Sequence, residues 1–265
     1  GSTDNTQALI QPCLDDQRVR YIYQANLGQP KAKNNGVKVA KGEFIAFCDA
    51  DDLWMPNKLS AEIPCFDLSP TIGVVSSEVA YIDENDDDIP SSDVPRHSGQ
   101  ITEQLVVYNC ISFGSAVVKR ECFDKLGLFD ESLPMGIDWD LWLRFSLSYE
   151  FHHIDEITYL YRVWSGQMSN NNRGRYLNAK KILDKFTVNN PDAVPDSIIN
   201  AAWADMYARE GRAIYCNEGL RWEALKSLVK ALSYKPFSPL TWKGIGKGVL
   251  GLRSWSFDFD KYKVE

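Results

Sequence analysis

Hydrophobic and polar positions alternate along the chain in a pattern that predicts helices and strands in turn. In the N-terminal part we expect a helix at 4–16, a strand at 19–24, a polar turn at 26–36 leading into a helix that ends near Lys41, and a strand at 43–49. The following part predicts helices at 56–67, 119–126 and 135–149 and strands at 72–83, 115–118 and 159–164. Elements at this spacing are typical of an α/β fold with a mainly parallel sheet.

Two polar stretches are expected to be loops. Residues 84–100 are acidic and rich in Pro and Ser, a composition that predicts a solvated loop. Residues 165–175 predict a second loop, which carries Arg173 and Arg175.

From Tyr176 onward the composition becomes helical, and residues 207–236 resemble one tetratricopeptide repeat. A single repeat cannot bury its own apolar face, so it is expected to pack on another unit. We therefore expect one unit at 1–175 and a helical extension at 176–265 that packs against it.

The charge balance limits the classes of partner. The chain carries a net charge of −7, which argues against broad nucleic-acid binding because that requires a basic face, but suits a protein that holds metal cations. Six cysteines without CxxC or metal-finger spacing predict reduced thiols, with Cys48 as a small core residue. No signal peptide opens the chain and no apolar run approaches the ~18 residues of a membrane span, so we expect a cytoplasmic protein.

The segment EFIAFCDADDLW at 43–54 places three carboxylates directly after an apolar run. Unbroken apolar residues predict a strand buried on both faces, as in a parallel sheet. Ligands of open α/β sheets bind beyond the carboxyl ends of the strands, where Asp49, Asp51 and Asp52 are expected to lie. Crowded carboxylates repel one another, and a divalent cation, Mn²⁺ or Mg²⁺, would relieve that repulsion. The alternative is that these acids cap the next helix.

Three segments of the chain resemble the family 2 glycosyltransferases of the GT-A fold. They are GSTDNT, KAKNNGVKVAKGEFIAFCDADDLWMPNKL and GSAVVKRECFDKLGLFDESLPMGIDWDLWLRFS, and together they cover most of residues 1–165. Asp49-Ala50-Asp51 matches the DXD motif of this family. The resemblance implies a GT-A (Rossmann-like) domain that uses a divalent cation and a nucleotide-sugar donor, a UDP-sugar in the first place. It also implies a carbohydrate or lipid-linked acceptor.

By this resemblance the acidic residues take separate roles. Asp51 would bind the cation that bridges the donor diphosphate, and Asp49 would contact the ribose or the ion. Asp138 matches the catalytic base that takes the proton of the acceptor hydroxyl, although Ile137 replaces the Glu of the usual acidic pair. Asp140 matches a supporting position nearby. From spacing alone, an N-cap role for Asp138 is the alternative.

Lys33 is a further donor-binding candidate, and Asp52, Asp140 and Arg173 are secondary candidates. Lys33 falls where many relatives carry an Arg that faces the nucleotide, and a solvated helix lysine is the alternative. Asp52 is the third acid of the cluster. Arg173 would close over the diphosphate, unless it lies on a mobile surface loop. Trp164 stands where the pattern YR-x-H is common, so a His that would contact metal or phosphate is replaced.

Relatives have a strand, a helix and a second strand before the GSTD turn, and these supply much of the nucleobase pocket. This chain starts at that turn, so we expect an N-terminally incomplete domain. Two functions follow. One is an inverting, metal-dependent glycosyltransferase of glycan or cell-surface polysaccharide synthesis. The other is a non-catalytic remnant that acts as an interaction module. The basic and aromatic stretch 241–256 is a candidate for peripheral membrane contact, although its glycines disfavour a helix.

Overall fold

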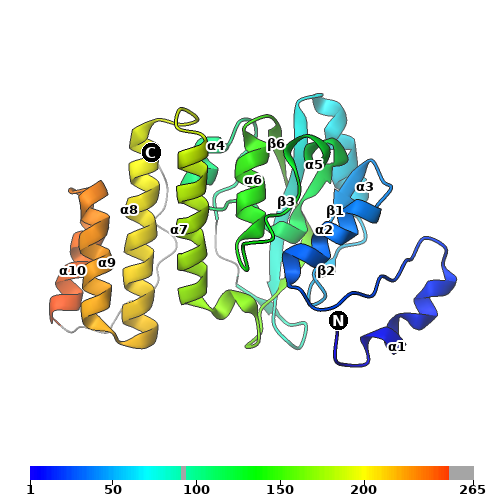
Figure 1. The fold of residues 1–265 in the computed structure, drawn as a ribbon, viewed down its shortest axis with the longest axis horizontal. Coiled ribbons are helices and arrows are strands. Elements are labelled where there is room, and N and C mark those ends of the chain that lie inside the picture. Colours follow the sequence, from blue (N-terminus) through cyan, green and yellow to red (C-terminus); the bar gives the residue numbers. More distant parts are fainter. Residues whose placement is uncertain (91–93, 251–265) are drawn as a thin grey trace.

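A computed structural model describes residues 1–90 and 94–250, and it confirms the α/β class (Figure 1). The strands within this part form one sheet with the order β1–β5–β3–β6–β2, and β4 pairs with β3. Their bounds are β1 Phe44–Ala46, β2 Leu53–Trp54, β3 Ile72–Ile82, β4 Asp88–Ile89, β5 Val117–Lys119 and β6 Glu150–Arg162. The longest ladder, between β3 and β6, is parallel, and the shorter ladders are antiparallel. β1 therefore runs in the direction of β3 and β6, because β5 lies between β1 and β3 and opposes both.

Alternate residues of the central strands face two different cores, as the period of two in a strand requires. Val74 and Val118 belong to the larger core, with side chains from α2, α4, α5 and α6. Val75 and Val117 point to the opposite face, where the segment after α3 covers them. The helices concerned are α2 Gln29–Val39, α3 Lys58–Glu62, α4 Thr102–Val107, α5 Arg120–Leu126 and α6 Ile137–Ser146.

Four helices follow one another away from the sheet in Figure 1 and form the extension. They are α7 Asn172–Asn189, α8 Asp196–Ala213, α9 Arg221–Tyr234 and α10 Pro239–Leu250. Leu183 of α7 and Met206 of α8 belong to the same buried cluster as the sheet, so the extension packs on the first unit as expected. α10 is helical despite its glycines, while positions 251–256 of the candidate membrane-contact stretch lie outside the described residues.

Short elements complete this part of the structure. α1 spans Thr6–Ile10 and continues into a 3₁₀ turn, which together match the helix expected at 4–16, and Figure 1 shows this N-terminal segment extending away from the sheet. The remaining turns are 3₁₀ segments and one π segment, at Gln11–Asp15, Ile63–Leu68, Phe113–Ser115, Met168–Asn170 and Ile214–Glu218. Within residues 1–90 and 94–250, no helix has both the length and the apolar character needed to cross a bilayer.

Three expectations about strands are wrong. Residues 19–24 form no strand because no described segment pairs with them, and the side chain of Tyr23 is left 67% exposed. Cys48 is exposed rather than part of the core, because β1 ends before it and the chain turns away from the sheet. β6 starts at Glu150, upstream of the strand predicted at 159–164, since polar residues in its first half obscure the apolar pattern.

The pattern also does not predict β2, β4 or α4. β2 and β4 have only two residues each, which is too short for alternation to show, and β4 lies in the stretch 84–100 that was expected to be a loop. α4 follows that stretch directly and buries Leu105 and Val106 in the larger core.

Candidate functional site

The acidic segment after β1 is held on β6 by Asp52. This carboxylate is 7% exposed, and its two oxygens accept hydrogen bonds from the Tyr159 hydroxyl and from the Arg162 backbone N–H at 2.8 Å. Burial raises the pKa of Asp52, and the hydrogen bond from Tyr159 opposes that shift. Both oxygens thus have partners inside the protein, which makes Asp52 an anchor for the acidic segment.

Arg162 is a second anchor, which the sequence did not indicate. Its Nε donates to the Asp51 carbonyl at 2.7 Å, and its Nη1 donates to the Asp83 carbonyl at 2.8 Å and pairs with Asp86 at 2.6 Å. The guanidinium therefore joins the acidic segment to the turn between β3 and β4. Arg162 is the last residue of β6, and the structure was needed to show where this strand ends.

Asp51 turns its carboxylate toward Trp164. The indole Nε1 donates to Asp51 Oδ2 at 2.9 Å, and Trp164 is 40% exposed. The other carboxylate oxygen of Asp51 accepts no hydrogen bond from the residues that the structure describes. Trp164 is thus in direct contact with Asp51.

Asp49 is paired with Lys33 of α2. Lys33 Nζ donates to Asp49 Oδ1 and lies 4.1 Å from the centroid of the Phe113 ring. The Lys33 side chain is only 10% exposed, so it is not a solvated helix lysine. A buried ammonium stacked on an aromatic face gains a cation–π interaction in addition to its ion pair. The structure therefore brings together two of the residues that the resemblance singles out.

Asp138 lies in the first turn of α6. The helix begins at Ile137 with Gly136 as its N-cap, so Asp138 is not the cap residue. Asn109 Nδ2 donates to Asp138 Oδ2 at 2.7 Å. Burial raises the pKa of Asp138, while the hydrogen bond from Asn109 and the positive charge of Lys33 oppose that rise. Of these effects on the pKa of Asp138, that of the Lys33 charge is the smallest.

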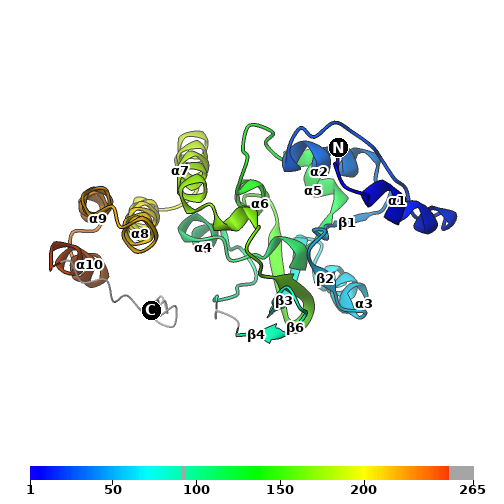
Figure 2. The same ribbon diagram turned by 90° about the horizontal axis from the view of Figure 1, so that it is seen from below.

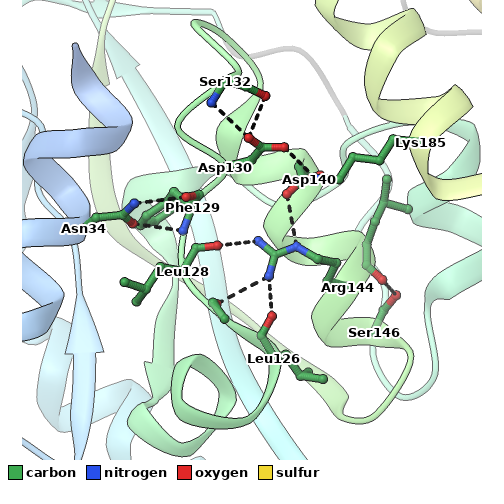
Figure 3. Close-up of polar contacts among 12 residues, drawn as sticks. Asn34, Leu126, Leu128, Phe129, Asp130, Ser132, Asp140, Arg144, Ser146 and Lys185 are labelled. Carbon is green, nitrogen blue, oxygen red and sulfur yellow. Dashed lines mark hydrogen bonds and ion pairs between the residues drawn. The ribbon is translucent and has the colours of Figure 1, made fainter. Parts of the chain in front are cut away.

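Asp140 points into the protein and supports α6 (Figure 3). It is 3% exposed, and it accepts from Lys185 Nζ at 2.7 Å and from Arg144 Nε at 3.1 Å. Lys185 also pairs with Asp130 at 2.7 Å, which ties α7 to the loop before α6. Arg144 donates to the carbonyl of Leu126, at the end of α5, and to that of Leu128 in the loop.

The same loop positions α2. The Asn34 amide accepts from the Phe129 backbone N–H at 2.9 Å and donates to the Phe129 carbonyl at 3.0 Å (Figure 3). This pair of hydrogen bonds fixes the helix that carries Lys33 against the segment that leads to α6 and Asp138. Asp140 thus supports α6 and, through Arg144 and Lys185, this loop.

Replacing Lys185, whose ammonium group bridges Asp130 and Asp140, should destabilise the fold. Hydrogen bonds to charged groups contribute about 1.5–3 kcal/mol each, so we expect Lys185→Met to lower the free energy of unfolding by about that amount in urea titrations. Lys125→Met is the matched control, because Lys125 pairs with Glu121 on the surface and such pairs contribute at most about 1 kcal/mol. Equal losses in the two variants would contradict a structural role for Lys185.

Arg173 is not brought to this group of residues. It lies on α7 and pairs with Glu218 at 2.7 Å and with Glu223 at 3.0 Å. These three side chains line a cavity of about 140 Å³ within the helical extension. The charge of Arg173 is thus paired with two carboxylates of the extension, and its contact with a diphosphate stays a prediction.

The residues present fit a cation site only in part. In the part of the chain that the structure describes, no three His, Cys, Asp or Glu side chains come close enough together to enclose a metal ion. Mg²⁺, however, needs only one or two protein carboxylates when waters and substrate phosphates fill its other positions. Asp51, with one oxygen available, meets that smaller requirement.

The chain matches a known family model and several curated relatives. Residues 1–127 match the model described as glycosyl transferase family 2. An uncharacterized glycosyltransferase of Methanocaldococcus jannaschii is 29% identical over 151 residues, which are 56% of this chain and 52% of that protein. One of a Nostoc species is 32% identical over 150 residues, 54% of this chain and 45% of that protein. The match spans about half the length of these two relatives and 21% of the length of one from Rickettsia bellii.

Solved structures show the same fold. TarS 1–349 of S. aureus superposes with a TM-score of 0.60 at 15% identity, covering 96% of this chain and 77% of TarS 1–349. The mannosyltransferase PcManGT of Pyrobaculum calidifontis, in complex with GDP-Man and Mn²⁺, gives a TM-score of 0.58 at 18% identity, covering 95% of this chain and 69% of that protein. At these identities the likeness establishes the fold.

Proposed function

Because residues 1–127 match the model of glycosyl transferase family 2, we propose that the chain transfers a sugar from a nucleoside-diphosphate donor to an acceptor hydroxyl. One observation carries the proposal: Lys33 of α2 is paired with Asp49 of the acidic segment that follows β1. The charge of Lys33 also has a small effect on the pKa of Asp138 of α6, which supports placing the proposed base near this pair. A direct transfer requires the donor site and the base to lie close together.

Asp51 is the proposed ligand of a divalent cation, Mn²⁺ or Mg²⁺. Its free oxygen supports this role, and Asp49, balanced by Lys33, would contact the donor ribose or the ion. When bound, the cation would neutralise charge on the diphosphate leaving group. The hydrogen bonds of Asp52 and Arg162 hold the acidic segment on β6 and so fix the position of Asp51.

Asp138 is the proposed general base. Its raised pKa makes the carboxylate a better proton acceptor than an ordinary aspartate, which favours removal of the proton from an acceptor hydroxyl. Attack by that hydroxyl on the face opposite the leaving group would invert the anomeric centre. Asn109 would hold the Asp138 carboxylate in orientation through its 2.7 Å hydrogen bond.

The donor class is proposed from what related structures bind. TarS 1–349 has been solved with UDP and with UDP-GlcNAc, and PcManGT with GDP-Man. We take a UDP-sugar as the first candidate donor and a GDP-sugar as the second. The acceptor is proposed to be a carbohydrate or a lipid-linked glycan, in glycan or cell-surface polysaccharide synthesis.

Thermal unfolding with Mn²⁺ and a panel of nucleoside diphosphates tests the proposal. A ligand that binds only the native state at one hundred times its Kd stabilises that state by about 2.7 kcal/mol, so we expect a clear rise in Tm with one nucleotide. The same nucleotide with a chelator and Mn²⁺ alone are the controls. No shift with any nucleotide would contradict the enzyme proposal and favour the alternative, a non-catalytic remnant that acts as an interaction module.

A further inference from the structure

The outermost element of the extension is the hairpin of α9 and α10, at the far left of Figures 1 and 2. Its solvent side is unusually apolar. Phe237, in the turn between the two helices, is 92% exposed, and Trp242 of α10 is 55% exposed. Val249 and Leu250, about two turns further along α10, are 53% and 72% exposed. We call these four residues the hairpin patch.

The opposite face of α10 is the packed one. Thr241 is 2% exposed, and Ile245 packs against the small cluster that joins α8 and α9. The helix is therefore amphipathic, with large apolar side chains on the side that no described residue covers. Exposed apolar patches of this kind mark surfaces that meet another apolar phase or partner.

Positive charge accompanies the patch. Residues 219–250 contain six Lys or Arg and a single acidic residue, whereas the whole chain has a net charge of −7. Lys235 and Lys243 are exposed; Lys235 stands two residues before Phe237, and Lys243 directly follows Trp242. A basic helix with large apolar side chains on its exposed face is typical of a segment that lies on a membrane surface.

Two hydrogen bonds fix the conformation of the hairpin patch. Trp242 Nε1 donates to the Pro236 carbonyl at 2.8 Å, which fixes the indole against the turn that carries Phe237. At the other end of the hairpin, Arg221 donates to the Val249 carbonyl and so joins the start of α9 to the end of α10. Fixed side chains lose less conformational entropy when they bind, which favours docking.

We propose that the hairpin patch docks on the surface of an anionic lipid bilayer, with α10 lying in the plane of the interface. Phe237 and Trp242 enter the boundary between headgroups and acyl chains, and Lys235 and Lys243 contact the anionic headgroups. A soluble polyanion would account for the lysines but not for the exposed aromatic and aliphatic side chains, so the bilayer is the better match. This interaction is independent of whether the chain transfers a sugar.

Sedimentation with lipid vesicles tests the interaction, using the full chain and vesicles of phosphatidylcholine with or without phosphatidylglycerol. We expect binding to the anionic vesicles only, weakening as salt is added because screening reduces attraction to the headgroups. Phe237→Ser with Trp242→Ser, and separately Lys235→Glu with Lys243→Glu, should each lower the partition coefficient by at least about 10-fold.

The matched control is Leu68→Ser with Val188→Ser, which removes apolar side chains that are 66% and 71% exposed elsewhere on the surface. It should bind vesicles as the parent chain does. Three outcomes would overturn the proposal: unchanged vesicle binding in both patch variants; binding to soluble polyphosphate that depends on the lysines alone; or, without vesicle binding, a dimer in sedimentation equilibrium that the aromatic variant abolishes. The last outcome would make the patch an interface between copies.

Discussion

Asp138→Asn is expected to lower kcat for sugar transfer by about 10²–10⁴-fold, the usual contribution of a positioned general base. The amide keeps the size of the carboxylate and can still accept the hydrogen bond from Asn109, so the site should retain its shape. Release of the nucleoside diphosphate from a nucleotide sugar gives the rate. Donor affinity, measured by the nucleotide-dependent rise in Tm, should stay unchanged. Loss of both rate and affinity would instead indicate a damaged site.

The pH dependence provides a second test of Asp138. A base acts when deprotonated, so the rate should rise with pH through the raised pKa of Asp138 and fall below it. The folded-state pKa lies above the unfolded one, so ionisation of this group weakens the native state as the pH rises. Asp138→Asn should therefore not lower the free energy of unfolding at neutral pH, which separates loss of the base from loss of the fold.

Asn109→Ala is the companion variant. The hydrogen bond from Asn109 holds the pKa of Asp138 down, so its removal should shift the rise in rate to higher pH. A structural role for Asn109 would lower the rate equally at every pH and leave the midpoint of the profile unchanged.

The elements that the sequence predicts correctly are those with clear apolar runs. β3 and α6 each combine a long apolar pattern with clear boundaries, and both lie close to where the pattern places them. β6 does not, because its first half carries His and acidic residues whose burial depends on the neighbouring strand β3. The segment 19–24 has strand-forming residues but no described partner, and a strand depends on pairing as well as on composition.

For the site, sequence reasoning identified the acids but not their partners. Asp49, Asp51 and Asp138 stand out because carboxylates follow a strand or open a helix. Their contacts with Lys33, Trp164 and Asn109 depend on the tertiary fold, since each pair is separated by many residues in the chain. Tertiary packing also decides which acids are structural. Asp52 and Asp140 resemble the others in sequence, yet both are buried and already satisfied.

Asp51→Ala is expected to abolish cation-dependent nucleotide binding. Without this carboxylate the proposed cation position keeps only Asp49, whose Oδ1 is already paired with Lys33, because Asp52 is buried with both oxygens bonded. The Mn²⁺-dependent stabilisation, about 2.7 kcal/mol for the parent chain at one hundred times Kd, should fall to near zero. Unfolding without ligand should be little affected, because Asp51 is only half-buried and Trp164, 40% exposed, can donate to water instead.

Two further variants make this result specific. Asp51→Asn keeps an acceptor for the Trp164 indole but removes the charge, so it should lose the cation response as completely as the alanine variant does. Asp155→Ala removes a fully exposed carboxylate of β6 and should respond as the parent chain does. If the asparagine variant keeps the response to Mn²⁺ and only the alanine variant loses it, then the hydrogen bond to Trp164, not a cation, is what the nucleotide site requires of Asp51.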